Sequence, residues 1–151
     1  MKITNYNIIL GSNSPRRREI LSQMGIEFEV RVSDKEELYP ENLKKEEVSE
    51  FLAIQKANNL RNDLREDELL ITSDTIVLND GEILNKPKNE KEAKEMLQSL
   101  SAKTHKVITS VCLLSTEKIK FFSERTNVTF SKLSDEIIQF YIENYNPFDK
   151  A

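Results

Sequence analysis

The sequence predicts an α/β protein with a mixed, twisted sheet flanked by helices, and three observations support this prediction. Segments with strand-like and helix-like patterns interleave along the whole chain. Residues 69–78 are apolar at successive positions around Ser73-Asp74-Thr75, as in a strand covered on both faces. The chain has 151 residues, of which 38% are hydrophobic and 32% charged, which is enough for one globular domain with a core.

The N-terminal third predicts a strand, a helix and a second strand. Residues 7–11 form a short apolar run that ends in glycine, as a buried strand does. Ser14 is a good N-cap residue and Pro15 suits the first helical position, so a helix is expected to start there. Gly25 ends that helix, and residues 26–32 then alternate between apolar and polar like a half-exposed strand.

The middle of the chain predicts an acidic loop, an amphipathic helix and a hairpin. The loop carries four acidic residues, Asp34, Glu36, Glu37 and Glu41. Apolar residues recur at helical spacing from Val48 to Leu60, which indicates one buried helix face. The strand at 69–78 runs into Asn79-Asp80-Gly81, a favoured hairpin turn, and then into a short strand at 83–84.

The C-terminal part predicts a helix, two strands and a last helix. Asn89 is expected to cap the first of these helices. Residues 105–114 and 117–131 have the patterns of strands. Ser134 is expected to cap the last helix, with two acidic residues in its first turn.

Charge and composition exclude several classes of protein. The net charge of −4 argues against nucleic acid or an anionic membrane as a partner. No apolar run approaches the about 20 residues of a membrane span, and the N-terminus has no signal-peptide pattern, so we expect a cytoplasmic protein. The single Cys112 excludes an internal disulfide and reads as a small core residue.

An arginine cluster at the start of the first helix is the first candidate site. Arg16, Arg17 and Arg18 lie where the helix dipole disfavours cations, and they also repel one another. A bound anion would relieve both effects, with help from backbone N–H groups and from the hydroxyls of Ser12 and Ser14. The alternative is a solvated basic turn, and the residues alone leave the two equally open.

Asp74 is the second candidate, because it interrupts an apolar strand between Ser73 and Thr75. A buried carboxylate costs several kcal/mol unless it is paired, hydrogen-bonded or bound to a metal. A functional carboxylate is favoured over one that caps a turn, since the strand stays apolar further along on both sides of Asp74.

Three more charged residues are weaker candidates. Lys56 lies within an apolar helix stripe, where a lysine that merely extends to solvent is the usual explanation. Lys86 and Glu37 lie in segments where most charges are solvated.

Other kinds of catalytic site have little support in the sequence. The chain has one histidine, His105, which argues against a histidine metal site or a Ser-His-Asp triad. The sequence contains no P-loop and no dinucleotide-binding glycine motif.

Together these residues resemble the Maf family, also called septum-formation inhibitor proteins, across the whole chain. The matching motifs, in chain order, are Ser12–Arg17 with the family's S-x-S-P-R-R loop, Glu37, Gln55-Lys56-Ala57, Ser73-Asp74-Thr75, Asn85-Lys86-Pro87, and Thr104-His105 with Val107 and Thr109. The last motif is typical of the branch that acts on dTTP and UTP. Six ordered matches make chance similarity improbable.

The resemblance implies a fold related to the inosine triphosphatases and hydrolysis of a nucleoside triphosphate, dTTP, UTP or a modified nucleotide, to the monophosphate and pyrophosphate. Implied phosphate-binding residues are Ser12, Ser14, Arg16, Arg17, Lys56 and Lys86. Arg16 and Thr75 are implied to set substrate specificity, and Asp74 to be the catalytic base. Glu37 and Asp74 are expected to hold a divalent cation, Mg²⁺ or Mn²⁺.

Two further expectations concern the extent of the chain and its partners. Residues 1–151 are expected to form a single Maf-like domain that lacks the family's C-terminal part, so that the chain by itself is expected to be weakly active or inactive. The expected partner is the nucleoside triphosphate, with no nucleic acid or membrane, and a homodimer is a candidate assembly. The alternative from another class is a non-catalytic, nucleotide-binding regulator of cell division, which would bind nucleotide without turnover.

Overall fold

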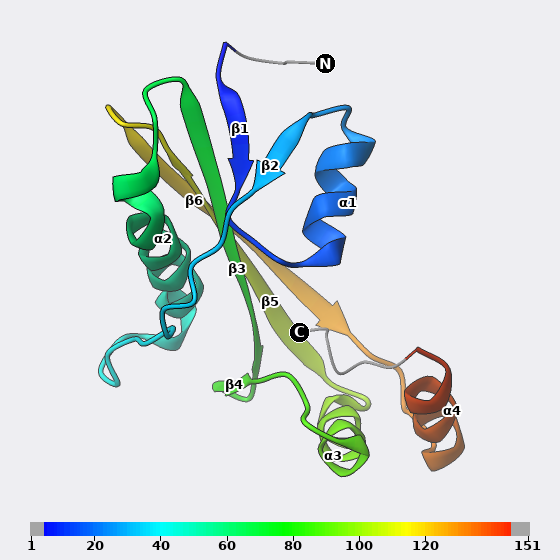
Figure 1. Cartoon of the computed structure of the whole chain (residues 1–151). Helices are drawn as coiled ribbons and strands as arrows, with labels where there is room; N and C mark the ends of the chain where they lie inside the picture. The colour runs from blue at the N-terminus through cyan, green and yellow to red at the C-terminus, as the bar shows by residue number, and fades with distance from the viewer. Residues whose placement is uncertain (1–4, 146–151) are drawn as a thin grey trace. The chain divides into compact units, whose positions relative to one another are not determined.

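The computed structural model describes residues 5–145, in which helices and strands interleave as the sequence predicts (Figure 1). The strands are β1 (Asn7–Leu10), β2 (Phe28–Val30), β3 (Glu68–Asn79), β4 (Glu82–Leu84), β5 (Thr104–Leu114) and β6 (Ile119–Thr129). The helices are α1 (Pro15–Gln23), α2 (Val48–Leu60), α3 (Glu90–Leu100) and α4 (Asp135–Tyr145), with short 3₁₀ turns at Lys45–Glu47 and Arg61–Asp63. Each predicted element is present, although β2 is shorter than the alternating pattern at 26–32 suggested.

The six strands form one mixed sheet in the order β2-β1-β3-β5-β6, with β4 paired to β3. β1 is parallel to both β2 and β3, whereas β4 is antiparallel to β3. β3 is buried along most of its length, which confirms the strand covered on both faces that residues 69–78 predicted. The mixed sheet flanked by helices confirms the predicted fold class.

The chain divides into two compact units. The first contains residues Met1–Asp74 and Thr109–Glu124, and the second contains Thr75–Ile108 and Arg125–Ala151. Among the described residues, no helix has the length and apolar character to cross a membrane.

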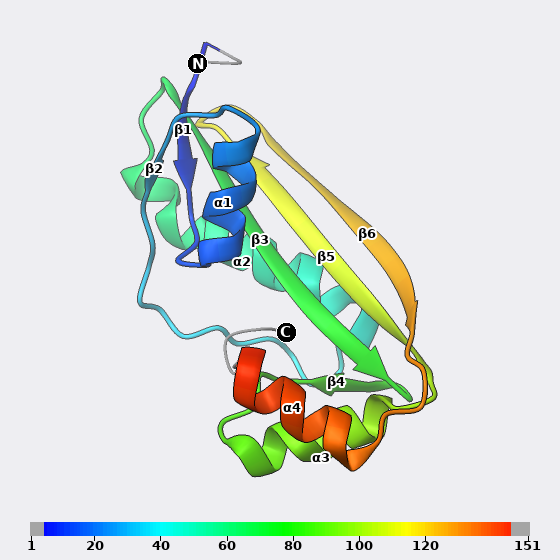
Figure 2. The ribbon, with the colours of Figure 1, turned by 90° about the vertical axis from the view of Figure 1, so that its right-hand side faces the viewer.

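The first unit holds α1 and α2 on opposite sides of its strands (Figures 1 and 2). Its core joins β1, α2, β3 and β5 through Ile9, Ala53, Ala57, Leu60, Leu70, Cys112 and Leu114. Cys112 is fully buried, as the sequence predicted. The core fixes α2 against the middle of β3, where Ser73 and Asp74 lie.

Gly11 lets the turn after β1 approach β3 closely. Its N–H donates to the carbonyl of Ile71 at 2.8 Å. A Cβ at this position would lie 2.8 Å from Cγ2 of Thr72, which is closer than real Cβ atoms come to a neighbour. Glycine is therefore required here, and it places the following Ser12-Asn13-Ser14 turn beside β3.

The second unit contains the predicted hairpin and a pair of helices that lie side by side (Figure 2). Asp80 and Gly81 both have positive φ, 53° and 79°, as the tight turn between β3 and β4 requires. The side chain of Asn89 accepts a hydrogen bond from the N–H of Glu92 at 2.9 Å, and Ser134 accepts one from Ile137 at 3.2 Å, so both predicted caps are confirmed. α3 and α4 pack through Ala93, Leu97, Leu133, Ile138 and Ile142.

Candidate functional site

The turn between β1 and α1 is held together by its own hydroxyl groups. Oγ of Ser14 accepts a hydrogen bond from the N–H of Arg17 at 3.3 Å, which makes Ser14 the N-cap of α1, with Pro15 at the first helical position. Oγ of Ser12 accepts from the N–H of Ser14 at 3.1 Å and from Nη1 of Arg17 at 3.3 Å. The two serines therefore order both the helix start and the arginine side chain.

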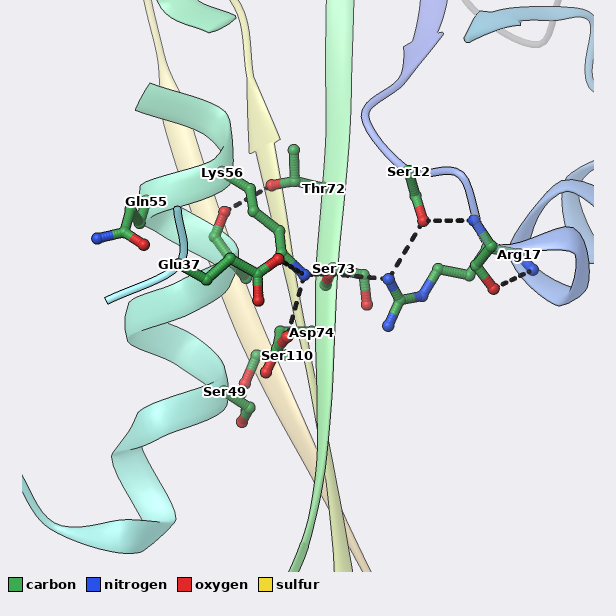
Figure 3. A network of polar contacts seen from close by, with 12 residues as sticks. Ser12, Arg17, Glu37, Ser49, Gln55, Lys56, Thr72, Ser73, Asp74 and Ser110 are labelled. Carbon is green, nitrogen blue, oxygen red and sulfur yellow. Dashed lines mark hydrogen bonds and ion pairs between the residues drawn. The ribbon is translucent and has the colours of Figure 1, made fainter. Parts of the chain in front are cut away.

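Arg17 differs from its two arginine neighbours, because it is half-buried and reaches β3. Its Nη1 donates to the carbonyl of Ser73 at 3.0 Å (Figure 3). Burial lowers the pKa of Arg17, while the carboxylates of Asp74 and Glu37 act in the opposite direction. Arg16 and Arg18 are exposed, and Arg18 bonds only locally among described residues, with Nη2 at 3.3 Å from Oδ1 of Asn13.

Lys56 projects from α2 to the opposite side of the same carbonyl (Figure 3). Its Nζ lies 3.1 Å from the carbonyl oxygen of Ser73, 3.0 Å from Oδ1 of Asp74 and 3.2 Å from Oε1 of Glu37. The contacts with Ser73 and Asp74 are hydrogen bonds and the contact with Glu37 is an ion pair, so three oxygen atoms surround the ammonium group. Lys56 is therefore a member of the polar cluster, and the alternative that it only extends to solvent is wrong.

Asp74 is buried, with 8% of its surface exposed. Its Oδ1 contacts Lys56, whereas its Oδ2 is buried and has no hydrogen-bond partner in the part of the chain described, residues 5–145. Burial raises the pKa of Asp74 despite the opposing effect of Lys56, and the negative charge of Glu37 raises it further. A buried oxygen without a hydrogen-bond partner costs free energy. We therefore expect Oδ2 of Asp74 to bind a proton, a water molecule or a cation.

Further polar contacts join α2 to the strands beside this cluster. The hydroxyl of Thr72 donates to the carbonyl of Ala53 at 2.7 Å, and Ser49 lies 2.8 Å from Ser110, with all of these groups buried. Thr72 immediately precedes Ser73, so its hydrogen bond ties the strand to the helix that carries Lys56. Sequence reasoning did not single out Thr72, Ser49 or Ser110. The one available signal was a polar residue, Thr72, in an apolar strand next to Ser73 and Asp74.

The first unit thus brings together most of the predicted site residues, namely Ser12, Ser14, Arg17, Glu37, Lys56 and Asp74. Arg16 belongs to the same unit, but its side chain is exposed. Thr75 and Lys86 belong to the second unit, where Thr75 is half-buried in β3 and Lys86 is exposed after β4.

Glu37 and Asp74 are the residues expected to hold a divalent cation. Residues 5–145 contain no group of three or more His, Cys, Asp or Glu side chains placed to bind a metal. Mg²⁺, however, is commonly held by one or two carboxylates, with water and substrate phosphates as its other ligands. Glu37 and Asp74 supply two carboxylates, both in contact with Lys56, and Oδ2 of Asp74 has no hydrogen-bond partner among the described residues. Such a pair of carboxylates fits the way in which Mg²⁺ is usually held.

Comparisons with known proteins agree with the motifs and the fold. The sequence matches the family described as Maf-like protein over residues 7–151. It is 51% identical over 150 residues to the dTTP/UTP pyrophosphatase of Phocaeicola vulgatus, covering 99% of this chain and 78% of that protein. It is 48% identical over 150 residues to the dTTP/UTP pyrophosphatase of Flavobacterium johnsoniae, covering 99% of this chain and 77% of that protein.

A solved structure shows the same fold despite low sequence identity. The Staphylococcus aureus Ham1 protein matches with a TM-score of 0.59 at 15% identity, over 85% of this chain and 72% of that one. The family match covers nearly the whole chain, and both relatives share about half of their aligned residues with it. The chain therefore belongs to the Maf family.

Proposed function

We propose that this protein hydrolyses a nucleoside triphosphate between the α and β phosphates and releases the monophosphate and pyrophosphate, with dTTP and UTP as its substrates. The observation that carries the proposal is the convergence of Arg17 and Lys56 on the carbonyl of Ser73, directly beside the buried carboxylate of Asp74. The names of its relatives, dTTP/UTP pyrophosphatases, support the same substrate class.

The cations would neutralise the triphosphate and the leaving pyrophosphate. Arg17 is already oriented by Ser12 and by the Ser73 carbonyl, and positive groups held in place in this way stabilise charge that develops during phosphate transfer. Lys56 already contacts three oxygen atoms, so a phosphate oxygen would replace one of them. The contact with Glu37 is the one to exchange, because the Glu37 side chain is 50% exposed and that of Asp74 only 12%.

Asp74 would accept a proton from the attacking water or orient it. Its unpartnered Oδ2 offers the lone pair, and Lys56 holds the other oxygen so that the carboxylate cannot rotate freely. The residues equally allow Asp74 to act as a ligand of a divalent cation that it would share with Glu37. Such a cation would screen the phosphate charge when bound.

The finer assignments belong to the same proposal. Exposed Arg16 and Lys86 would contact the triphosphate, with Ser12 and Ser14 as hydroxyl donors, and Arg16 and Thr75 would help to select the base. We place the protein in the cytoplasm, as a single Maf-like domain in solution, with a homodimer as its assembly. Size-exclusion chromatography with light scattering measures the assembly.

The rate of hydrolysis should fall on acidification at a pH above the range of an ordinary aspartate. Asp74 has to be ionised to accept a proton, and burial raises its pKa above the usual 3.8. We therefore expect kcat to drop about tenfold per pH unit below the pKa of Asp74 in the folded protein. A pH–rate profile over a range where the fold is intact, checked by circular dichroism, measures this. A rate that stays constant down to the ordinary aspartate pKa would contradict the assignment.

The test of the function is product analysis across the common ribo- and deoxyribonucleoside triphosphates with Mg²⁺ or Mn²⁺. Monophosphate and pyrophosphate in equal amounts are expected, with dTTP and UTP the best substrates. Release of inorganic phosphate with a diphosphate would place the cleavage elsewhere and overturn the proposal. Nucleotide binding without turnover would favour the non-catalytic regulator.

A further inference from the structure

The side chain of Gln55 makes two reciprocal hydrogen bonds to one residue of the acidic loop. Its Nε2 donates to the carbonyl of Leu38 at 2.8 Å, and its Oε1 accepts from the N–H of Leu38 at 3.2 Å. A carboxamide that satisfies both backbone groups of one residue fixes that residue in position and orientation, as a neighbouring strand would. Figure 3 shows Gln55 on α2, close to Lys56 and to the loop that carries Glu37.

The acidic loop has little else to hold it. Residues 31–44 contain no helix or strand. The other hydrogen bonds within 32–44 are local, from the N–H of Lys35 to Oγ of Ser33 at 3.2 Å and from the N–H of Leu43 to the carbonyl of Pro40 at 3.1 Å. Among the described residues, Gln55 makes two hydrogen bonds that join 32–40 to another element, and Glu37 adds an ion pair with Lys56 and an electrostatic attraction to Arg17.

Neighbouring residues of α2 contact neighbouring residues of the acidic loop. Consecutive residues of α2, Gln55 and Lys56, hold consecutive residues of the loop, Leu38 and Glu37. The ion pair of Lys56 with Glu37 is weak by itself, because the Glu37 side chain is half-exposed and pairs of this kind contribute little. The hydrogen bonds to the backbone of Leu38, the next residue, therefore restrain the position of Glu37 more firmly than this ion pair does.

We propose that Gln55 is a positioning residue for Glu37: its carboxamide clamps the backbone of Leu38 to α2 and thereby keeps the carboxylate of Glu37 beside Asp74 when Lys56 exchanges its Glu37 contact for a phosphate oxygen. The inference deepens the proposed function and rests on it. Gln55 acts through Glu37, so its contribution to the rate exists only while the carboxylate of Glu37 is present.

The first experiment measures the clamp without any reaction. Gln55→Met keeps the length of the side chain and removes both hydrogen bonds. In native-state hydrogen exchange followed by NMR, the Leu38 amide should exchange about three- to tenfold faster in this variant, as expected for loss of a neutral hydrogen bond. Gln98→Met is the matched control: Gln98 is an exposed glutamine of α3, and its substitution should leave the exchange of Leu38 unchanged.

The second experiment asks whether Gln55 works through Glu37. Gln55→Met should lower kcat about three- to tenfold in the wild-type background, as expected for loss of a neutral hydrogen bond. It should have no further effect in Glu37→Gln, because the two changes remove one function. Gln55→Glu keeps an acceptor for the Leu38 N–H but has no donor for the Leu38 carbonyl. Its kcat should therefore stay below that of the wild type, as in Gln55→Met. Equal effects of Gln55→Met with and without Glu37 would show a merely structural role and overturn the inference.

The outcomes separate the inference from the function on which it rests. A wild-type protein that hydrolyses no nucleoside triphosphate overturns both. An active wild type in which Gln55→Met leaves the exchange of the Leu38 amide unchanged overturns the inference alone.

Discussion

Asp74→Asn is expected to abolish pyrophosphate release while the protein stays folded and is at least as stable at neutral pH. Asparagine keeps the shape of aspartate and can still accept a hydrogen bond from Lys56, but it cannot accept a proton from water. Loss of a general base typically costs a factor of about 10² to 10⁴ in rate. Nucleotide binding should persist, because Arg17 and Lys56 are unchanged.

The stability of this variant follows from the raised pKa of Asp74. A carboxyl whose pKa is higher in the folded than in the unfolded protein favours folding below its unfolded value near 3.8. That contribution is lost as the pH rises through the folded pKa, so at neutral pH the ionised Asp74 destabilises the fold. The neutral asparagine removes this cost.

Thermal unfolding and nucleotide binding should be measured alongside the rate. Asp80→Asn is a matched control, because Asp80 lies in the exposed turn before β4, where asparagine tolerates the positive φ of 53°. Its ion pair with Lys103 is exposed and contributes little. Full activity of Asp74→Asn would refute the catalytic role, and an unfolded variant would refute the argument about stability.

Lys56→Met is expected to lower kcat/KM by a factor of ten or more. The substitution keeps the apolar stem that packs in α2 and deletes the charge that contacts Glu37, Asp74 and the carbonyl of Ser73. Loss of a hydrogen bond to a charged group costs about 1.5–3 kcal/mol, which corresponds to this factor or more. Asp74 also loses its cationic partner, so its pKa should rise further and the acid limb of the pH–rate profile should move to higher pH.

Measuring both kcat/KM and the pH–rate profile distinguishes a specific role of Lys56 beside Asp74 from a general effect of losing a lysine. Lys94→Met is the matched control, since Lys94 is an exposed lysine within α3, and both its rate and its pH profile should equal those of the wild type. Wild-type kinetics in Lys56→Met would mean that the ammonium group contacts no phosphate. A reduced rate with an unshifted acid limb would mean that Lys56 does not set the pKa of Asp74.

The sequence by itself determined the elements, because their signals are local. Caps at Ser14, Asn89 and Ser134 depend on one side chain and a backbone N–H three residues away, and the turn at Asp80-Gly81 depends on the φ of two residues. The apolar run of β3 and the apolar stripe of α2 follow from which faces of each element are buried. The motifs also sufficed to identify the Maf family, since six matches in the same order along the chain make a chance resemblance improbable.

Only the tertiary structure decided which charged residues act together, because those contacts cross long stretches of chain. Arg16, Arg17 and Arg18 look alike in sequence, but only Arg17 is turned towards β3, where it meets a carbonyl 56 residues further along. The apolar stripe around Lys56 suggested a lysine that extends to solvent, whereas the packing of α2 on β3 brings its ammonium to Asp74. The clamp of Gln55 on Leu38 has no pattern in the sequence at all, since it pairs a helix side chain with the backbone of an irregular loop.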